Sequence, residues 1–212
     1  IETQRLRNKQ VICMIDESGS MFDSTERFKR AISGSVSVLM SLEPGSFFGL
    51  YTFGKTLVEV YEPMNISKPP RSGTDKYETN KNEFQSNLAK LANSERWKGS
   101  DGRQTEQSRK TTLYDSIKKI LTKIKQPPQE FIKIQVELVV LTDGDDNGSE
   151  SSVQETNAYI KRYVNARSWL DRLHITVLAI GMDDDSACKA MVAGKFANNN
   201  AVGDVTSSAT IT

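Results

Sequence analysis

An aspartate and two serines stand at alternate positions directly after an apolar run near the start of the sequence. The stretch VICMIDESGSMFDS (11–24) contains Asp16, Ser18 and Ser20, with Gly19 between the two serines. Side chains at alternate positions can point into one concavity, and the glycine permits the backbone to bend tightly. Carboxylate and hydroxyl oxygens are hard ligands, which suit Mg²⁺ or Mn²⁺. The pattern therefore predicts that this segment contributes to a cation site.

Two other segments are expected to bring oxygen ligands to the same place. Asp143 ends the apolar run VELVVLTD (136–143), and Thr111 opens an amphipathic stretch. In parallel sheets with helical crossovers the working site lies at the carboxyl ends of the strands, so both residues should meet the first segment there. Thr112 is adjacent and is a second candidate for the role of Thr111.

The charge of these side chains indicates binding rather than catalysis. Two carboxylates balance a divalent cation and the hydroxyls add no charge, so a bound metal would keep an open coordination position. An acidic side chain from another molecule is a natural ligand for that position. The single histidine, His174, is expected at the amino-terminal end of a strand, away from these residues, and is interpreted as structural.

Short apolar runs alternate with amphipathic segments, and this order determines where the oxygen ligands can lie. The runs expected to form strands buried on both faces are 10–16, 136–143 and 174–181, with a short strand near 202–205. The helices are expected from Asp23 to Pro44-Gly45, over 81–93, over 111–124, from Ser152 through Leu170, and over 185–196. Asp23 and Ser152 each precede a glutamate by three residues, which is a capping-box pattern.

One pair of strands is expected to run antiparallel. Residues 47–53 and 56–62 are separated by Gly54-Lys55, which predicts a hairpin. Strands that alternate with helices specify a doubly wound α/β fold with right-handed crossovers. We therefore expect a mostly parallel sheet with one antiparallel edge strand and helices on both faces.

The composition indicates one domain and gives no electrostatic argument for nucleic acid or a membrane. The 212 residues suit a single domain over 1–212, and 28 Lys+Arg against 27 Asp+Glu give a net charge of +1. No stretch approaches the ~20 apolar residues of a membrane helix. Cys13 and Cys188 are interpreted as buried thiols, which weakly favours a reducing, intracellular compartment. The chain starts at Ile1 without a signal-peptide pattern, so we expect it to be a piece of a larger protein.

The oxygen ligands and the order of elements resemble the von Willebrand factor type A (vWA) domain, the family that includes integrin inserted domains. Its metal-ion-dependent adhesion site is written Asp-x-Ser-x-Ser, then a distant Thr, then a distant Asp. The matching segments here are DESGSM (16–21), TTLYDSI (111–117) and LTDG (141–144), with FGLYTF (48–53) and VLAIG (177–181) as strand segments. The resemblance covers the chain except for the polar, insertion-like region 64–110, which either builds a binding face or packs over the sheet edge.

The resemblance implies a set of metal ligands and a kind of partner. Ser18, Ser20 and Thr111 would bind the metal directly or through water, with Asp16 and Asp143 supplying the charge. Mg²⁺ is the expected cation, with Mn²⁺ or Ca²⁺ as alternatives, and the partner would be a protein that presents Asp or Glu. The family's site implies no catalysis.

The residues beside these ligands are expected to form a partner-binding rim. They are Met21, Phe22, Arg109, Lys110, Asp145 and Asp146. The family often places two glycines before the threonine, and here Arg109-Lys110 either steer an acidic ligand or are solvated loop residues. Asp145 and Asp146 would raise cation affinity while repelling acidic partners.

Two other functions compete with metal-dependent protein binding. The first is a metal-independent scaffold domain of a larger assembly, against which the intact ligand pattern argues. The second is a magnesium-dependent phosphotransferase with Asp16 as nucleophile. That chemistry needs an acid or base two positions later, where Ser18 stands and cannot serve.

Overall fold

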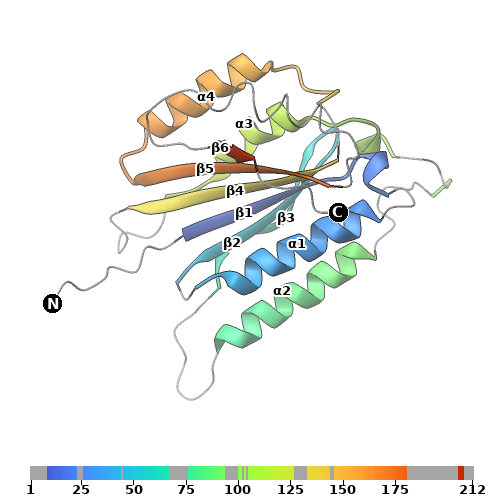
Figure 1. Ribbon diagram of the computed structural model, residues 1–212, viewed down its shortest axis with the longest axis horizontal. Helices are drawn as coiled ribbons and strands as arrows, with labels where there is room; N and C mark the ends of the chain where they lie inside the picture. Colours follow the sequence, from blue (N-terminus) through green and yellow to red (C-terminus); the bar gives the residue numbers. More distant parts are fainter. Residues whose placement is uncertain are drawn as a thin grey trace.

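A six-stranded sheet forms the middle layer of the molecule (Figure 1). This computed structural model describes residues 9–22, 26–43, 45–66, 76–93, 100–101, 103, 105–126, 133–143, 146–180 and 205–207. The strands are β1 (Lys9–Asp16), β2 (Phe47–Phe53), β3 (Leu57–Asn65), β4 (Ile134–Thr142), β5 (Leu170–Ala179) and β6 (Val205–Ser207). Their order across the sheet is β3-β2-β1-β4-β5-β6.

The sheet is parallel except at one edge. β1 pairs in parallel with both β2 and β4, and β5 pairs in parallel with β4 and β6. β3 pairs antiparallel with β2 and lies at the edge, as the sequence predicts. Because these pairings are parallel, the carboxyl ends of β1, β2, β4 and β5 lie at one edge of the sheet. This edge is at the right of Figure 1.

Helices cover both faces of the sheet. α1 (Arg27–Ser41) and α2 (Lys76–Ala92) lie on one face, and α3 (Leu113–Lys123) and α4 (Val153–Asn165) lie on the other (Figure 1). Two short 3₁₀ helices, η1 (Gly19–Phe22) and η2 (Gln107–Arg109), follow β1 and precede α3. The doubly wound α/β fold expected from the sequence is confirmed.

The sheet separates two apolar cores, and β1 contributes to both. Ile12 and Met14 face α3 and α4, whereas Val11, Cys13 and Ile15 face α1. All five side chains are at most 1% exposed, which explains why the sequence of β1 is apolar on both faces. Burial raises the pKa of the Cys13 thiol to about 12, so the sulfur is an inert core atom.

Several element boundaries differ from the sequence-based expectations. α2 begins at Lys76, five residues before the expected start at 81. The sequence analysis missed these five residues because they show no apolar periodicity. Leu170 is the first residue of β5 and does not belong to α4, which ends at Asn165. Periodicity cannot distinguish the next turn of a helix from the first buried residue of the following strand. β5 therefore starts four residues before His174, which lies inside the strand opposite Glu137.

The capping predictions had different outcomes. Ser152 and Glu155 form the expected capping box at the start of α4. α1 begins at Arg27, after Glu26 in a left-handed backbone conformation with φ 55°. The predicted start at Asp23, the helix over 185–196 and Cys188 lie outside the described residues. None of the helices that the structure describes is long and apolar enough to cross a membrane.

Candidate functional site

Asp16 lies at the carboxyl end of β1, where the sequence places the candidate site. Its side chain is buried, and the residue is 0% exposed. One carboxylate oxygen accepts the backbone N–H of Ser18 at 2.7 Å, and the other accepts the Thr142 hydroxyl at 2.6 Å. These bonds join the loop after β1 to the last residue of β4, so the two strand ends are held together.

A chain of hydrogen bonds continues from Asp16 through both serines to Asp143. The hydroxyls of Ser18 and Ser20 are 3.1 Å apart, and Ser20 donates to Oδ1 of Asp143 at 2.9 Å. The structure therefore brings together four of the five predicted ligands through direct contacts. The side-chain atoms of these four residues that could coordinate a metal are all oxygens, and Mg²⁺ and Mn²⁺ prefer oxygen ligands.

The charge balance of this cluster favours a cation. Burial raises the pKa of Asp16 from 3.8 to about 6, and the nearby Asp143 carboxylate also raises it, while hydrogen bonds from Thr142 and Ser18 lower it. A buried carboxylate next to a second carboxylate is costly to ionise unless positive charge lies beside it. A bound divalent cation would supply that charge, so the residues present fit a metal ion.

Arg27 also supplies positive charge to this cluster, and the sequence analysis missed it. Its Nη1 lies 2.7 Å from Oδ2 of Asp143, whose side chain is 0% exposed, while the Arg27 side chain is 20% exposed. The topology gives the signal that could have found it. The helix after β1 must start at the carboxyl edge of the sheet, so its first-turn residues lie next to the ligands.

Thr111 reaches the same edge through its backbone. The residue is 2% exposed, and its N–H donates to Oδ1 of Asn147 at 2.8 Å. Its carbonyl accepts the N–H groups of Asn147 and Gly148 at 3.1 and 3.0 Å. The hydroxyl of the neighbouring Thr112 donates instead to the carbonyl of Gly54 at 2.7 Å. Thr112 is thus committed to the β2–β3 turn, which leaves Thr111 as the better candidate for a ligand.

The segment before Thr111 is fixed to the β2–β3 turn by Gln107. The side-chain oxygen of Gln107 accepts from the N–H and the hydroxyl of Thr56 at 3.0 and 2.9 Å, and its Nε2 donates to the Thr56 carbonyl at 2.6 Å. The Lys55 N–H donates to the Gln107 carbonyl at 2.9 Å. A side chain at Gly54 would place Cβ 2.0 Å from that carbonyl, so the close approach requires glycine.

The loop after β4 is joined to the start of α3 by two aspartates. Asp146 accepts the N–H groups of Tyr114 and Ser149, each at 2.9 Å. Asp115 accepts the N–H of Glu150 at 2.8 Å. Asp146 is half-buried and holds its own loop, so it is not a free acidic group of the rim.

The structure places the other predicted rim residues in different environments. Met21 is 0% exposed, because η1 turns its side chain into the core beneath α1, so its expected place on the rim is wrong. Phe22 is half-buried, with its ring centroid 4.4 Å from that of Phe28. Arg109 and Lys110 are exposed. Asp145 lies outside the described residues.

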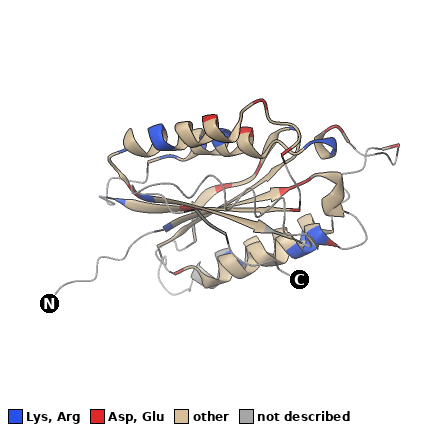
Figure 2. Cartoon of the chain, turned by 45° about the horizontal axis from the view of Figure 1, so that its top comes forward, with Lys and Arg blue, Asp and Glu red and all other residues tan. Residues whose placement is uncertain are grey.

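Basic residues also gather at the start of α1. The first turn of this helix contains Arg27, Lys29 and Arg30, and Figure 2 shows its basic residues as a blue group at one end. Lys29 pairs with Glu26 at 2.7 Å. Arg30 is exposed.

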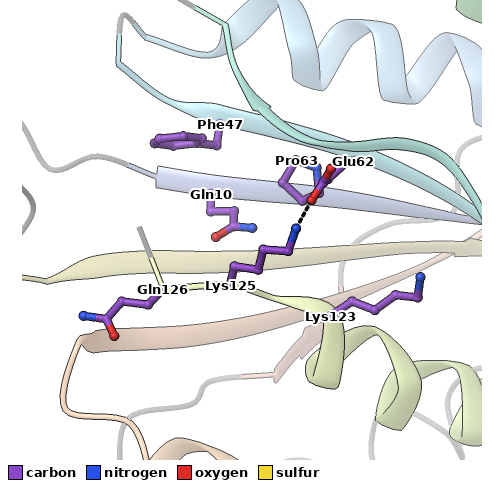
Figure 3. Close-up of a pocket in the computed structure, with 7 residues that line it drawn as sticks. All are labelled: Gln10, Phe47, Glu62, Pro63, Lys123, Lys125 and Gln126. Atoms are coloured by element: carbon purple, nitrogen blue, oxygen red, sulfur yellow. Dashed lines mark hydrogen bonds and ion pairs between the residues drawn. The ribbon is translucent and has the colours of Figure 1, made fainter. Parts of the chain in front are cut away.

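A cavity of about 180 Å³ lies at the opposite edge of the sheet (Figure 3). Its lining includes Gln10, Phe47 and Pro63, and an ion pair between Lys125 and Glu62 crosses it. Gln10 is six residues before Asp16 in β1, which corresponds to about 20 Å along a strand. The cavity is therefore separate from the candidate metal ligands.

Within the described part of the chain, no group of three or more His, Cys, Asp or Glu side chains is arranged to hold a metal ion. The candidate site depends on two carboxylates, and hydroxyls supply its other oxygens. A cation bound there would keep coordination positions for water or for a partner's oxygen.

Comparison with solved structures identifies the fold. The chain superposes on a von Willebrand factor type A protein from Catenulispora acidiphila with a TM-score of 0.55 and 15% identity, over 96% of this chain and 39% of that one. It matches the D319A mutant of the PilB minor pilin from Streptococcus sanguinis with a TM-score of 0.56 and 11% identity, over 98% and 59% of the two chains. The open conformation of the pilus adhesin SpaC from Lactobacillus rhamnosus GG matches with a TM-score of 0.51 and 13% identity, over 86% and 25%.

These similarities establish a vWA-type fold, as the sequence motifs imply. At 11–15% identity they concern the fold alone. No protein-family model and no curated protein matches the sequence. The chain spans 39% of the Catenulispora protein and 59% of the pilin.

Proposed function

We propose that this chain is a protein-interaction domain that binds an acidic residue of a partner through a divalent cation, with Mg²⁺ as the first candidate and Mn²⁺ or Ca²⁺ as alternatives. The observation that carries the proposal is the hydrogen-bonded chain from Asp16 through Ser18 and Ser20 to Asp143 at the carboxyl edge of the sheet. Thr111 would complete the ligand set. The presence of a pilus adhesin among the proteins with this fold supports an interaction role.

The residues of the site suit binding better than catalysis. A phosphotransferase that used Asp16 as nucleophile would need an acid or base two positions later. Ser18 occupies that position, and its hydroxyl cannot take that role at neutral pH. The proposed role of the chain is therefore to hold a cation whose remaining coordination position accepts a carboxylate from another protein.

Titration calorimetry of Mg²⁺, Mn²⁺ and Ca²⁺ into metal-free protein tests the proposal. We expect saturable binding by the wild type and its loss in Asp16→Ala and in Thr111→Ala. Asp171→Ala is the matched control, because Asp171 is exposed at the amino end of β5. No binding by the wild type at millimolar metal would contradict the metal-dependent mechanism.

One observation favours a second candidate, a metal-independent interaction domain. Arg27 already supplies a positive charge to Asp143. In that case the wild type would bind no metal, and Asp16→Ala would leave partner binding unchanged. The same titration distinguishes the two functions before any partner is known.

A further inference from the structure

We propose that Arg27 is an internal competitor for the metal: its guanidinium holds Asp143 in the metal-free protein and must leave that carboxylate when a cation binds. This inference deepens the proposed function and depends on it. According to this inference, Arg27, which lies outside the ligand motif, controls the metal affinity of the site.

Both oxygens of Asp143 are occupied in the structure. Oδ1 accepts the hydroxyl of Ser20 at 2.9 Å, and Oδ2 accepts Nη1 of Arg27 at 2.7 Å. The Asp143 side chain is 0% exposed, so its charge is balanced by these neighbours rather than by bulk water. A carboxylate oxygen can accept from more than one partner, but a cation that coordinates Oδ2 would lie directly beside the guanidinium. A serine hydroxyl is itself a ligand for such a cation, whereas a guanidinium has no acceptor and repels it.

The charges of the cluster lead to the same conclusion. Two ionised carboxylates, Asp16 and Asp143, carry two negative charges, and Arg27 neutralises one of them. A divalent cation added beside Arg27 would repel the guanidinium at short range, which is costly in a poorly solvated place. Arginine stays protonated in proteins, so Arg27 cannot escape this conflict by losing its charge.

The position of Arg27 allows the side chain to leave. The residue is the first of α1, and its side chain is 20% exposed, so it has a path to solvent. Its neighbour Phe28 is 2% exposed and stacks with Phe22, which anchors the backbone while the long side chain moves. Metal binding is therefore coupled to the first turn of α1 through one ion pair.

Titration calorimetry with Mg²⁺ and Mn²⁺ on three proteins tests the inference. Arg27→Gln removes the competing charge and should bind metal about tenfold more tightly than the wild type. Arg30→Gln makes the same charge change on an exposed residue of the same turn, and its affinity should stay within about twofold because solvent screens the charge. Arg27→Lys keeps the charge and should remain close to the wild type.

Thermal unfolding in a chelator provides a readout that is independent of metal affinity. Without metal, Arg27→Gln leaves the buried Asp143 without its cation, so its Tm should fall by several degrees while that of Arg30→Gln stays close to the wild type. Saturating metal should restore the Tm of Arg27→Gln.

The outcomes separate the inference from the proposed function. If the wild type binds metal and Arg27→Gln binds with equal or lower affinity, the proposed function stands and the inference is wrong. If Arg27→Gln binds metal while the wild type does not, Arg27 competes as inferred, but the proposed metal-dependent function of the wild type is wrong. If no variant binds any cation, the proposed function fails and this inference fails with it.

Discussion

At the scale of single residues, the environment of Asp16 is unfavourable for an ionised carboxylate. It is buried, lies near a second carboxylate, and is stabilised by a hydroxyl and a backbone N–H rather than by a cation. The ionised form of such a group is destabilised by burial, and a cation that binds beside it relieves this destabilisation. The same property makes the metal-free protein sensitive to pH.

Metal-free wild-type protein should lose stability relative to Asp16→Asn as the pH rises from about 4 to about 6. The pKa of Asp16 is raised from 3.8 to about 6, so in this window the folded state keeps a proton that the unfolded chain releases. The stabilisation by this proton is complete below the unfolded pKa and is lost above pH 6, a difference on the order of 3 kcal/mol. Urea unfolding in a chelator at stepped pH values measures it.

Asp171→Asn is the control for this pH experiment, because that carboxylate is exposed. Its stability should follow the wild-type pH profile. Parallel profiles for the wild type and Asp16→Asn would mean that Asp16 has an ordinary pKa in the folded protein.

At the scale of elements, the candidate site depends on segments that are far apart in the sequence and are fastened to one another. Thr111 is held by the loop after β4, and the segment before it is held by the β2–β3 turn. The hydrogen bonds of these two attachments involve none of the predicted ligand side chains. The hydrogen bonds of Gln107 and Asn147 nevertheless determine where the threonine lies.

Gln107→Ala should loosen the Thr111 segment without unfolding the domain. It removes three hydrogen bonds to Thr56 near the surface, which should cost about 1 to 2 kcal/mol of stability. Hydrogen exchange should become faster at the Lys55 and Thr112 amides, whose acceptors belong to this junction. Gln154→Ala, at an exposed position of α4, should leave both amides protected. Unchanged protection in Gln107→Ala would show that the backbone bonds alone hold the segment.

The sequence predicts the strands and the ligand segments well because their signals are local. β1 and β4 are apolar on both faces, and Ser152 with Glu155 marks the start of α4. Other features depend on where a side chain points after the chain has folded. Arg27 forms an ion pair with Asp143, and the side chain of Met21 in η1 is buried. Spacing in the sequence contains no information about either direction.

At the scale of the whole molecule, the polar region 64–110 contributes to the domain. Within it, α2 packs beside α1 over the same face of the sheet (Figure 1). Phe84 is 4% exposed and meets the rings of Phe48 and Tyr61 edge-on, with centroids 5.7 and 5.1 Å away. Of the two roles considered for this region, packing against the sheet is the one that α2 performs.

Phe84→Ala should therefore destabilise the entire domain by about 3 kcal/mol, because it opens a cavity between α2 and the sheet. Met40→Ala is the control, since Met40 is 48% exposed on α1 and its loss should cost less than about 0.5 kcal/mol. Urea unfolding followed by circular dichroism measures both variants. A change as small as that of Met40→Ala would mean that α2 is attached loosely and unfolds by itself.

The buried thiol of Cys13 can be used to measure local unfolding of the domain. The thiol is completely buried in β1, between β2 and β4, and its pKa of about 12 keeps it protonated. The Cys13 side chain faces α1, so an alkylating reagent can reach the sulfur when α1 separates from the sheet. The rate of modification at Cys13 therefore measures how often α1 leaves the sheet, and a cation or partner bound beside the first turn of α1 should lower that rate.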